Sequence, residues 1–342
     1  MKLLQEPRHV HAEMKCKYMH SLSYLIFCMS ILKASGFAAI EPQNNANLAI
    51  APEKGDNFDT KFIPEILYES DRILVINKPT EISHHDNGET GEVGIVSRVR
   101  EYYNQNNTLP LSSPQNSRLY GVHRLDRVTS GILLFAKDRE MASILGKKFK
   151  NNELTKYYIG ISNHKPKKQK QGFVKGNMVR GRRKSWYLTR ENKNNYATTR
   201  FFSAGLGHLY EYKLTKNDHV DDSPAGYDPK TCLLFHPQTG KTHQIRVAAK
   251  SVGLPLLADP IYGGISGMYP RAFLHATAIH LPLEDVDGHD PVTIFCPPPF
   301  APLLWEEEAN DLFHQVVLDL FRKHCECPEI LDCLCSENYH EN

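Results

Sequence analysis

The most informative segment of the chain is His123-Arg-Leu-Asp-Arg-Val-Thr-Ser-Gly131. Its Asp126 lies between Arg124 and Arg127, and nearby cations favour the charged form of a carboxylate. The Thr-Ser-Gly that follows is typical of a turn that presents a side chain at the edge of a cleft. A carboxylate placed there can act as a nucleophile or a base toward a sugar carbon, while the arginines bind phosphates. Taken alone, the same pattern also fits a helix cap or a surface charge.

Five further blocks occur along the chain. They are Asp71-Arg-Ile-Leu-Val-Ile-Asn-Lys-Pro79, Lys156-Tyr-Tyr158, Gly240-Lys-Thr-His-Gln-Ile-Arg-Val247, Gly253-Leu-Pro-Leu-Leu-Ala-Asp-Pro-Ile-Tyr-Gly263 and Arg271-Ala-Phe-Leu-His-Ala276. In kind and in order, these blocks and the first segment resemble those of the RluA-type pseudouridine synthases. The resemblance runs from about Ile66 to Pro297. Two departures, Lys241 for the commoner Arg and Ala258 for Gly, keep charge or size.

The resemblance implies an α+β fold, in which a mixed, largely antiparallel sheet with flanking helices and loops surrounds an active-site cleft. It also implies that the protein isomerises specific uridines in rRNA or tRNA to pseudouridine, exchanging the C1′–N1 bond for C1′–C5. Asp126 would be the catalytic aspartate, attacking C1′ or removing the C2′ proton. Tyr158 would stack on the base and take the C5 proton, and Arg246 would pair with Asp126. Without the resemblance, Arg246 is a strand residue that can equally face solvent.

The resemblance also implies a set of substrate-binding residues. Arg124 would enter the RNA stack where the target uridine leaves, because a flipped base vacates a gap. Leu274 would pack under the flipped base, although plain core packing explains it equally well. We assign His123 and Arg127 of the same segment to substrate binding too. No cofactor is expected, in agreement with the lack of a Gly-rich phosphate loop.

No metal is expected at this site either. Three histidines, His236, His243 and His275, lack a recognised metal-ligand spacing. We therefore interpret them as hydrogen-bonding residues.

Charge is distributed unevenly along the chain, although its formal net value is only +2. Thirteen Lys or Arg and one acid lie between residues 155 and 200, whereas residues 281–342 hold fourteen acids and two bases. The basic segment 165–190 predicts a polyanionic partner, RNA, with Trp186 or Tyr187 stacking on an unpaired base. The alternative is a solvated loop. Hydrophobic residues at 41% and charged residues at 23% exclude collagen-like, wholly disordered and multi-span membrane proteins.

Local patterns predict the elements of the fold. We expect strands over residues 66–68, 72–77, 132–136, 157–161 and 197–202, a helix over 141–149 capped by Asp138, and a loop over 104–116. Residues 243–247 read as a strand that leads into a short helix ending at Gly253. Apolar and acidic residues alternate over 303–324 as in a surface helix.

The two ends of the chain differ from its middle. Residues 1–60 read as a cleaved targeting leader and linker, because a basic start precedes the apolar run 22–32, which is too short to span a bilayer. An RNA enzyme with such a leader is expected in an organelle, the plastid being favoured over the mitochondrion. Residues 325–342 form a Cys-rich tail with C-x-C-x5-C-x-C, either a loose tail or a zinc site.

Together these observations predict a catalytic domain over residues 61–324, with the basic insertion 165–190. The protein is expected to act on RNA as a monomer, with no membrane association in its mature form. The alternative is a non-catalytic RNA-binding protein that retains the fold. A second alternative is a zinc-dependent nucleic-acid protein built on the C-terminal cysteines.

Overall fold

The computed structural model describes residues 62–106, 119–190, 195–207, 229–263, 269, 271–284, 286, 290–300 and 310–335. Its strands are β1 (Glu65–Glu69), β2 (Ile73–Lys78), β3 (Tyr120–Gly121), β4 (Ser130–Ala136), β5 (Thr155–Ser162), β6 (Gln171–Arg180), β7 (Trp186–Thr189), β8 (Tyr196–Gly205), β9 (Thr231–Pro237), β10 (Leu274–Leu281) and β11 (Val292–Phe295). Its helices are α2 (Ile95–Asn106), α3 (Arg139–Asn151), α5 (Gln244–Ser251), α7 (Asn310–His324) and α8 (Pro328–Cys335). The expected leader lies outside the described residues. Within these ranges, the helices are too short or too polar to cross a membrane.

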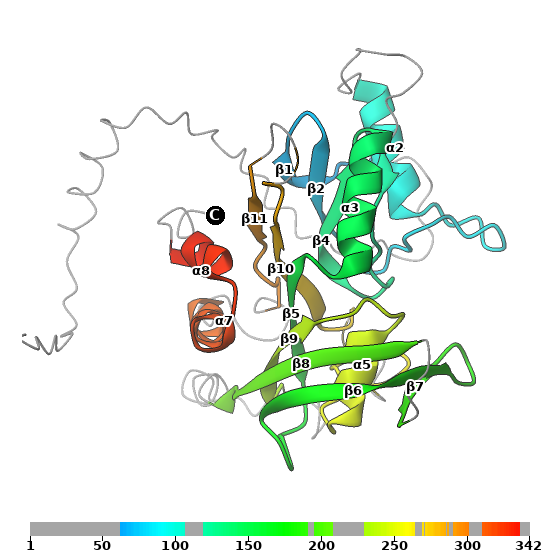
Figure 1. Cartoon of the computed structure of the whole chain (residues 1–342). Coiled ribbons are helices and arrows are strands. Elements are labelled where there is room, and N and C mark those ends of the chain that lie inside the picture. The colour runs from blue at the N-terminus through cyan, green and yellow to red at the C-terminus, as the bar shows by residue number, and fades with distance from the viewer. Residues whose placement is uncertain are drawn as a thin grey trace, which may run out of the picture. The chain divides into compact units, whose positions relative to one another are not determined.

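The described strands form one sheet in the order β1-β2-β4-β10-β5-β9-β8-β6-β7, with β11 added beside β10 and β3 beside β4 (Figure 1). Neighbouring strands run antiparallel, except that β10 runs parallel to β4. The α+β class with a mixed, largely antiparallel sheet is therefore confirmed. The single parallel pair lies at the centre, where Gly131 is in register with Ala276.

Helices α5 and α7 cover opposite faces of the β8–β9 part of the sheet. Phe201, Leu233 and Phe235 pack in one cluster with residues of α5. Their chain neighbours Phe202 and Leu234 pack in another cluster with residues of α7. Successive side chains of a strand point to opposite faces, so this half of the sheet is buried on both sides.

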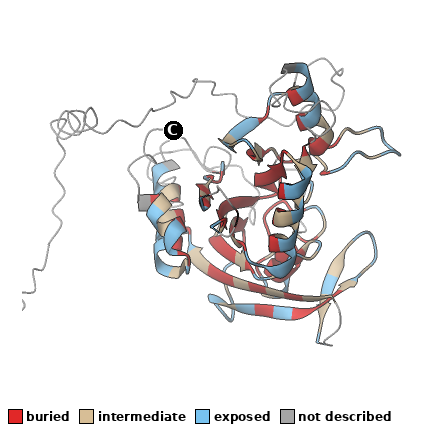
Figure 2. Ribbon diagram, turned by 45° about the horizontal axis from the view of Figure 1, so that its top comes forward, coloured by how far each residue is buried: buried red, intermediate tan, exposed pale blue. Residues whose placement is uncertain are grey.

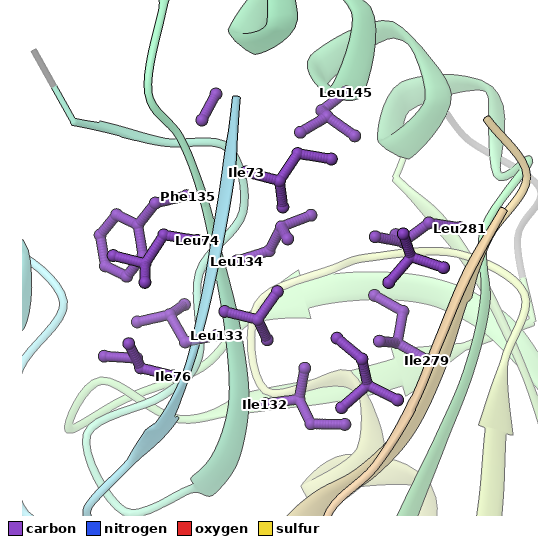
Figure 3. Close-up of a cluster of buried hydrophobic side chains, with 14 of the residues drawn as sticks. Ile73, Leu74, Ile76, Ile132, Leu133, Leu134, Phe135, Leu145, Ile279 and Leu281 are labelled. Carbon is purple, nitrogen blue, oxygen red and sulfur yellow. The ribbon is translucent and has the colours of Figure 1, made fainter. Parts of the chain in front are cut away.

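The β2–β4 half of the sheet holds a third cluster of apolar side chains. Residues 73–76 of β2 and 132–135 of β4 are all at most 2% exposed. They pack with α2, α3 and the end of β10, and Figure 3 shows Leu145 of α3 and Leu281 of β10 beside them. Figure 2 shows buried residues concentrated in the central strands, while the helices keep an exposed outer side. Burial on both faces explains why these strands read as continuous apolar runs.

Several local predictions are confirmed. Helix α3 begins after Asp138, whose Oδ1 accepts a hydrogen bond of 2.8 Å from the backbone N–H of Met141. The predicted strands at 72–77, 132–136, 157–161 and 197–202 correspond to β2, β4, β5 and β8. Helix α7 buries one face, which includes Phe313, Leu320 and Phe321. Residues 303–309, the first part of the expected surface helix, lie outside the described residues.

Two local predictions are wrong. Residues 244–247 begin helix α5 and do not form a strand. His243 turns the chain with a φ of 56°, and Ile245, Ala248 and Ala249 then face the sheet at helical spacing. The expected loop 104–116 begins too early, since α2 continues to Asn106. Residues 107–118 lie outside the described residues.

The basic segment forms two strands of the sheet. Strands β6 and β7 pair antiparallel from Asn177↔Thr189 to Arg180↔Trp186, and β6 also pairs with β8 along its length. Residues 171–180 and 186–189 of this segment are therefore strands and not a loop. At the C-terminal end, α8 packs against β10 and β11, with Ile330 fully buried. The loose-tail alternative is therefore wrong as far as residue 335.

We predict that Gly131→Ala destabilises the fold. Gly131 has a φ of 103°, and an added Cβ would lie 2.3 Å from the carbonyl oxygen of Ala276 on the parallel partner strand. Backbone strain and the clash together should lower the free energy of unfolding by about 2–4 kcal/mol. Urea denaturation followed by circular dichroism measures this change.

The matched control is Gly146→Ala. Gly146 lies within α3, and nothing is within 4 Å of its added Cβ. This variant should gain about 0.5–1 kcal/mol, because Ala favours a helix interior over Gly. Equal stability of the Gly131→Ala variant and the wild type would contradict the tight packing of β4 against β10.

Candidate active site

The turn between β3 and β4 carries Asp126. Lys78, at the end of β2, contacts the backbone of this turn. The backbone N–H of Thr129 donates to the carbonyl oxygen of Asp126 at 3.0 Å. The Nζ of Lys78 donates to the carbonyl oxygens of Thr129 and Arg127 at 2.9 Å and 3.3 Å. Lys78 is fully buried, and burial lowers its pKa to about 7. The Asn-Lys-Pro block therefore fixes the backbone that follows Asp126.

A buried polar group supports the same turn from the side of β10. The Nδ1 of His275 lies 2.7 Å from the Oγ of Ser130, which also accepts a hydrogen bond from Arg271. Burial lowers the pKa of His275 well below its usual value, so its ring is neutral. The start of β4 is thereby fixed immediately after Asp126, and the interpretation of His275 as a hydrogen-bonding residue is confirmed.

Arg246 links two carboxylates at the centre of the site. Its Nη1 donates to the Oδ2 of Asp126 at 3.1 Å. Its Nε and Nη2 donate to the two carboxylate oxygens of Asp259 at 2.7 Å and 2.8 Å. Burial alone would lower the pKa of Arg246, but the hydrogen bonds and charge of Asp259, together with Asp126, raise it above its usual value. The guanidinium therefore stays charged beside Asp126, and the predicted pairing is present.

Asp126 opens into a cavity of about 340 Å³. This volume falls within the roughly 300–1,000 Å³ typical of ligand sites. Six of the eight predicted site residues line the cavity, namely His123, Arg124, Asp126, Tyr158, Arg246 and Leu274. They come from the β3–β4 turn, β5, α5 and β10, so the fold brings together residues that are far apart in the sequence.

Two predicted residues lie outside this cavity. Arg127 is directed to acidic side chains, with its Nε 3.4 Å from Glu81 and its Nη1 3.8 Å from Glu92. Trp186 lines a different cavity, beside the β6–β7 turn. Neither residue is placed to touch a base held beside Asp126.

Within the cavity, His123 and Tyr158 are half-buried, and their surroundings fix their protonation. The Nε2 of His123 accepts a hydrogen bond of 3.0 Å from the backbone N–H of Leu134, and its ring stacks on Phe149 at 4.6 Å. Burial lowers the pKa of His123 to about 3, so its ring is a neutral acceptor. Burial also raises the pKa of Tyr158, and the charge of Asp126 raises it further. The phenol of Tyr158 therefore keeps its proton at neutral pH.

The sequence interpretation gave no catalytic role to three residues that shape the site. Asp259 is 1% exposed and orients Arg246. His243 lies with its Nε2 3.9 Å from the Oδ2 of Asp126 and its Nδ1 3.0 Å from the hydroxyl of Tyr262. Lys156 lines the cavity, and burial lowers its pKa to about 8. The sequence carried no signal for Asp259, because the burial of Arg246, which calls for a carboxylate partner, is seen only in the fold.

Possible metal ligands group elsewhere in the described part of the chain. The ligand atoms of His280, Cys327 and Glu329 lie within 4.8 Å of one another. The Sγ of Cys327 donates to Glu329 at 3.0 Å, and the Nδ1 of His280 lies 2.8 Å from the Oγ1 of Thr293. Of the C-terminal cysteines whose side chains the structure describes, Cys325, Cys327 and Cys333, only Cys327 belongs to this group, and none of its three members lines the cavity of Asp126. Its residues therefore take no part in the chemistry at Asp126.

A charged aspartate paired with a buried arginine, beside a tyrosine and an apolar floor, defines the class of enzyme that exchanges a glycosidic bond within a nucleotide. Residues 72–251 match the family model described as RNA pseudouridylate synthase. The chain is 36% identical over 216 residues to an RNA pseudouridine synthase of Haemophilus influenzae, a match that covers 63% of this chain and 80% of that protein. It is also 30% identical over 220 residues to the ribosomal large subunit pseudouridine synthase C of Rickettsia typhi, covering 63% of this chain and 62% of that protein.

A solved structure agrees in fold. Human RNA pseudouridylate synthase domain containing 1 superposes with a TM-score of 0.51 at 21% identity, covering 75% of this chain and 96% of that one. The chain belongs to the RNA pseudouridylate synthase family. The predicted family is confirmed, and the protein is an RNA pseudouridine synthase, which is an isomerase.

We predict that RNA affinity depends on pH through Lys156. Because its pKa is about 8 in the free protein, its Nζ is mostly charged at pH 7 and mostly neutral at pH 9. If this charge contacts an RNA phosphate, the dissociation constant should rise as pH rises, by up to about tenfold, which is the change in charged fraction. Filter binding at constant salt measures the effect.

Lys156→Gln should bind RNA more weakly at pH 7 and change little from pH 7 to pH 9. The matched control is Lys147→Gln on the exposed side of α3, which should keep the wild-type pH dependence. A Lys156→Gln variant with the full wild-type pH dependence would show that another group titrates.

Proposed function

We propose that the protein isomerises specific uridines in ribosomal or transfer RNA, with Asp126 as the catalytic group. The observation that carries this proposal is the 3.1 Å contact between Arg246 and Asp126 at the cavity wall. This contact sets the direction of the carboxylate while leaving its side chain 17% exposed for a substrate.

The target uridine enters the cavity by leaving the RNA stack. Arg124 is exposed at the cavity mouth and is placed to fill the vacated position. Leu274 and Tyr158 line the interior, where an apolar side chain and a phenol ring provide surfaces for a flat base. His123 supports this region through its stacking on Phe149 and its bond to the backbone.

The reaction exchanges one glycosidic bond for another. Asp126 either attacks C1′, giving a covalent ester as the C1′–N1 bond breaks, or removes the C2′ proton as that bond breaks, giving a glycal. In the second route the proton returns to C2′ when C5 bonds to C1′. The freed uracil turns within the cavity and bonds to C1′ through C5; the C5 proton then leaves, and N1 ends up protonated. Both routes conserve atoms and need no external oxidant or reductant.

Tyr158 acts in this scheme chiefly by stacking. Its raised pKa makes the phenol a poor base for the C5 proton at neutral pH, although its hydroxyl can relay a proton that passes to another acceptor. The positive charge of Arg246 stabilises the negative charge of the Asp126 carboxylate whenever this carboxylate is not bonded to the sugar. The non-catalytic alternative is disfavoured because this arrangement of charges is intact.

Ribosomal RNA is the substrate class that we favour over transfer RNA. Support comes from the similarity to the protein of Rickettsia typhi whose name specifies the large ribosomal subunit. Exposed cations on the β6–β7 turn, Arg182, Arg183 and Lys184, supply phosphate affinity close to the site. The chain is proposed to act as a monomer, since one chain supplies every residue named above.

We predict that the purified protein forms pseudouridine in transcribed large-subunit RNA and that Asp126→Asn abolishes product formation. Carbodiimide-based mapping of pseudouridine, with and without protein, measures the product. The variant should fall below about one thousandth of the wild-type rate, because the Asn side chain cannot replace a carboxylate nucleophile or base. Its RNA affinity should stay within about threefold of wild type, because the substituted group is not a phosphate contact.

The matched control is Asp332→Asn, an exposed aspartate on α8, which should keep wild-type activity. Product made by Asp126→Asn would show that the nucleophile is misassigned. Modification of transfer RNA in place of ribosomal RNA would change the substrate class. The absence of product on any RNA would refute the enzymatic proposal.

We also propose that residues 1–60 direct the protein to an organelle that contains RNA, the plastid being favoured over the mitochondrion. The proposal rests on the basic start and apolar run of the sequence, which lie outside the described residues. A fluorescent reporter fused to residues 1–60 is expected to enter the plastid and to be shortened by cleavage. A reporter that remains uncleaved in the cytosol would refute it.

A further inference from the structure

A second cavity lies beside α5, at the turn between β6 and β7. Its volume is about 660 Å³. Val247, Lys250 and Ser251 of α5 line this cavity, whereas Ile245 and Arg246 of the same helix line the cavity of Asp126. Figure 1 shows α5 next to β6 and β7. The helix that supplies Arg246 is therefore a wall common to both cavities.

The lining of the second cavity combines positive charge with flat side chains. Arg182, Arg183 and Lys250 are cationic, and no acidic residue occurs among the described lining residues. Trp186 and the half-exposed Tyr187 contribute aromatic rings. Cations bind phosphates and aromatic rings stack on bases, so this combination suits an unpaired nucleotide. A small apolar metabolite would not need three cations.

The turn that carries the two arginines of this lining has a strained backbone. Residues Arg183 and Lys184 both have positive φ, 52° and 61°. The backbone N–H of Ser185 donates to the carbonyl oxygen of Arg182 at 3.0 Å and closes the turn. Tight turns with two consecutive left-handed residues favour the pair Asn-Gly, because most other residue types are unfavourable at positive φ. Long cationic residues in a strained turn point to a role for their charge.

Two hydrogen bonds and one longer electrostatic contact connect this cavity to Asp126. The backbone N–H of Trp186 donates to the hydroxyl of Tyr262 at 2.7 Å, and Tyr262 lines the second cavity. The same hydroxyl lies 3.0 Å from the Nδ1 of His243, whose Nε2 is 3.9 Å from the Oδ2 of Asp126. Burial lowers the pKa of His243, so its neutral ring can accept the proton of the tyrosine hydroxyl. The position of the β6–β7 turn is thereby tied to the catalytic side chain.

We propose that the second cavity binds another unpaired nucleotide of the same RNA, one that flanks the target uridine. Its base stacks on Trp186 or Tyr187, and its phosphates contact Arg182, Arg183 and Lys250. This rests on the proposed function in that RNA is the partner, and it adds a specificity requirement. The substrate presents at least two extrahelical nucleotides, one for each side of α5.

Binding can be measured without turnover, through the fluorescence of Trp186. The chain contains two tryptophans, so Trp305→Phe leaves Trp186 as the reporter. The probe is a twelve-nucleotide oligouridylate, and the comparison is an abasic strand of equal length. The oligouridylate should quench the fluorescence of Trp186, whereas the abasic strand should bind through its phosphates with little quenching. Equal quenching by both strands would overturn the stacking proposal.

Charge reversal tests the phosphate contacts. The Arg182→Glu/Arg183→Glu variant should raise the dissociation constant of the oligouridylate at least tenfold. The matched control is Arg322→Glu/Lys323→Glu, an equal charge change at an exposed adjacent pair on α7, which should raise it less than threefold. Equal losses in the two variants would show a general electrostatic effect and would overturn the assignment to the cavity.

The specificity requirement is tested on the RNA in which the enzyme forms pseudouridine. Abasic nucleotides are introduced one at a time on either side of the target uridine. At one of these positions, the abasic substitution should lower the kcat/KM of the wild type at least fivefold. On intact RNA, Trp186→Leu should lower kcat/KM by the same factor. The abasic substitution should then cause no further loss in the Trp186→Leu variant. Additive losses would mean that Trp186 and that nucleotide do not meet, and would overturn the proposal.

The outcomes separate this inference from the proposed function. Quenching of Trp186 without pseudouridine on any RNA would refute the enzymatic proposal and leave the nucleotide site standing. Pseudouridine formation without quenching, or without any sensitive flanking position, would refute the nucleotide site and leave the enzyme standing.

Discussion

The buried guanidinium of Arg246 constrains the whole active site. It is 3% exposed and lies between Asp259, which holds it in two hydrogen bonds, and Asp126, which it contacts through Nη1. Removing one partner of such a buried pair typically destabilises a protein by about 3–5 kcal/mol, because a charge is left uncompensated. The ion pair between Arg246 and Asp259 therefore does more than orient the arginine side chain. It fixes the position of a positive charge to which the turn carrying Asp126 must adapt.

This constraint explains the arrangement of the elements around it. Arg246 lies on α5, Asp259 follows that helix, and Asp126 lies on the turn before β4 on the other half of the sheet. The two halves meet through β10, which runs parallel to β4 and antiparallel to β5. Gly131 permits the close approach of β4 to β10, since a Cβ there would overlap the backbone of Ala276. The contact between Arg246 and Asp126 thus depends on a central strand pairing that leaves no room for a side chain.

The sequence was sufficient to predict the site residues that belong to recognisable motifs. It was insufficient to predict features that depend on how the backbone folds. Asp126, Tyr158, Arg246 and Leu274 all line one cavity as predicted. The segment His243-Gln-Ile-Arg-Val247 was misread as a strand, since five residues of mixed polarity fit either period until the left-handed His243 is seen. Asp259 received no role, because only the fold brings its carboxylate to Arg246. The direction of Arg127 toward Glu81 and Glu92 was equally beyond reach, since those acids lie in a separate segment.

The shared helix is a physical route by which RNA bound in the proposed second site would act on the groups around Asp126. Along α5, Arg246 faces Asp126 and Lys250 faces the second cavity, one turn further on. Tyr262 lies against the guanidinium of Arg246, with 5.1 Å between its ring centre and Cζ, and its hydroxyl bonds the backbone of Trp186. A nucleotide that orders the β6–β7 turn would therefore also restrict the ring of Tyr262 and the arginine beneath it. Charge on the turn attracts any RNA, but only an RNA with a correctly placed second nucleotide would fix the groups around Asp126.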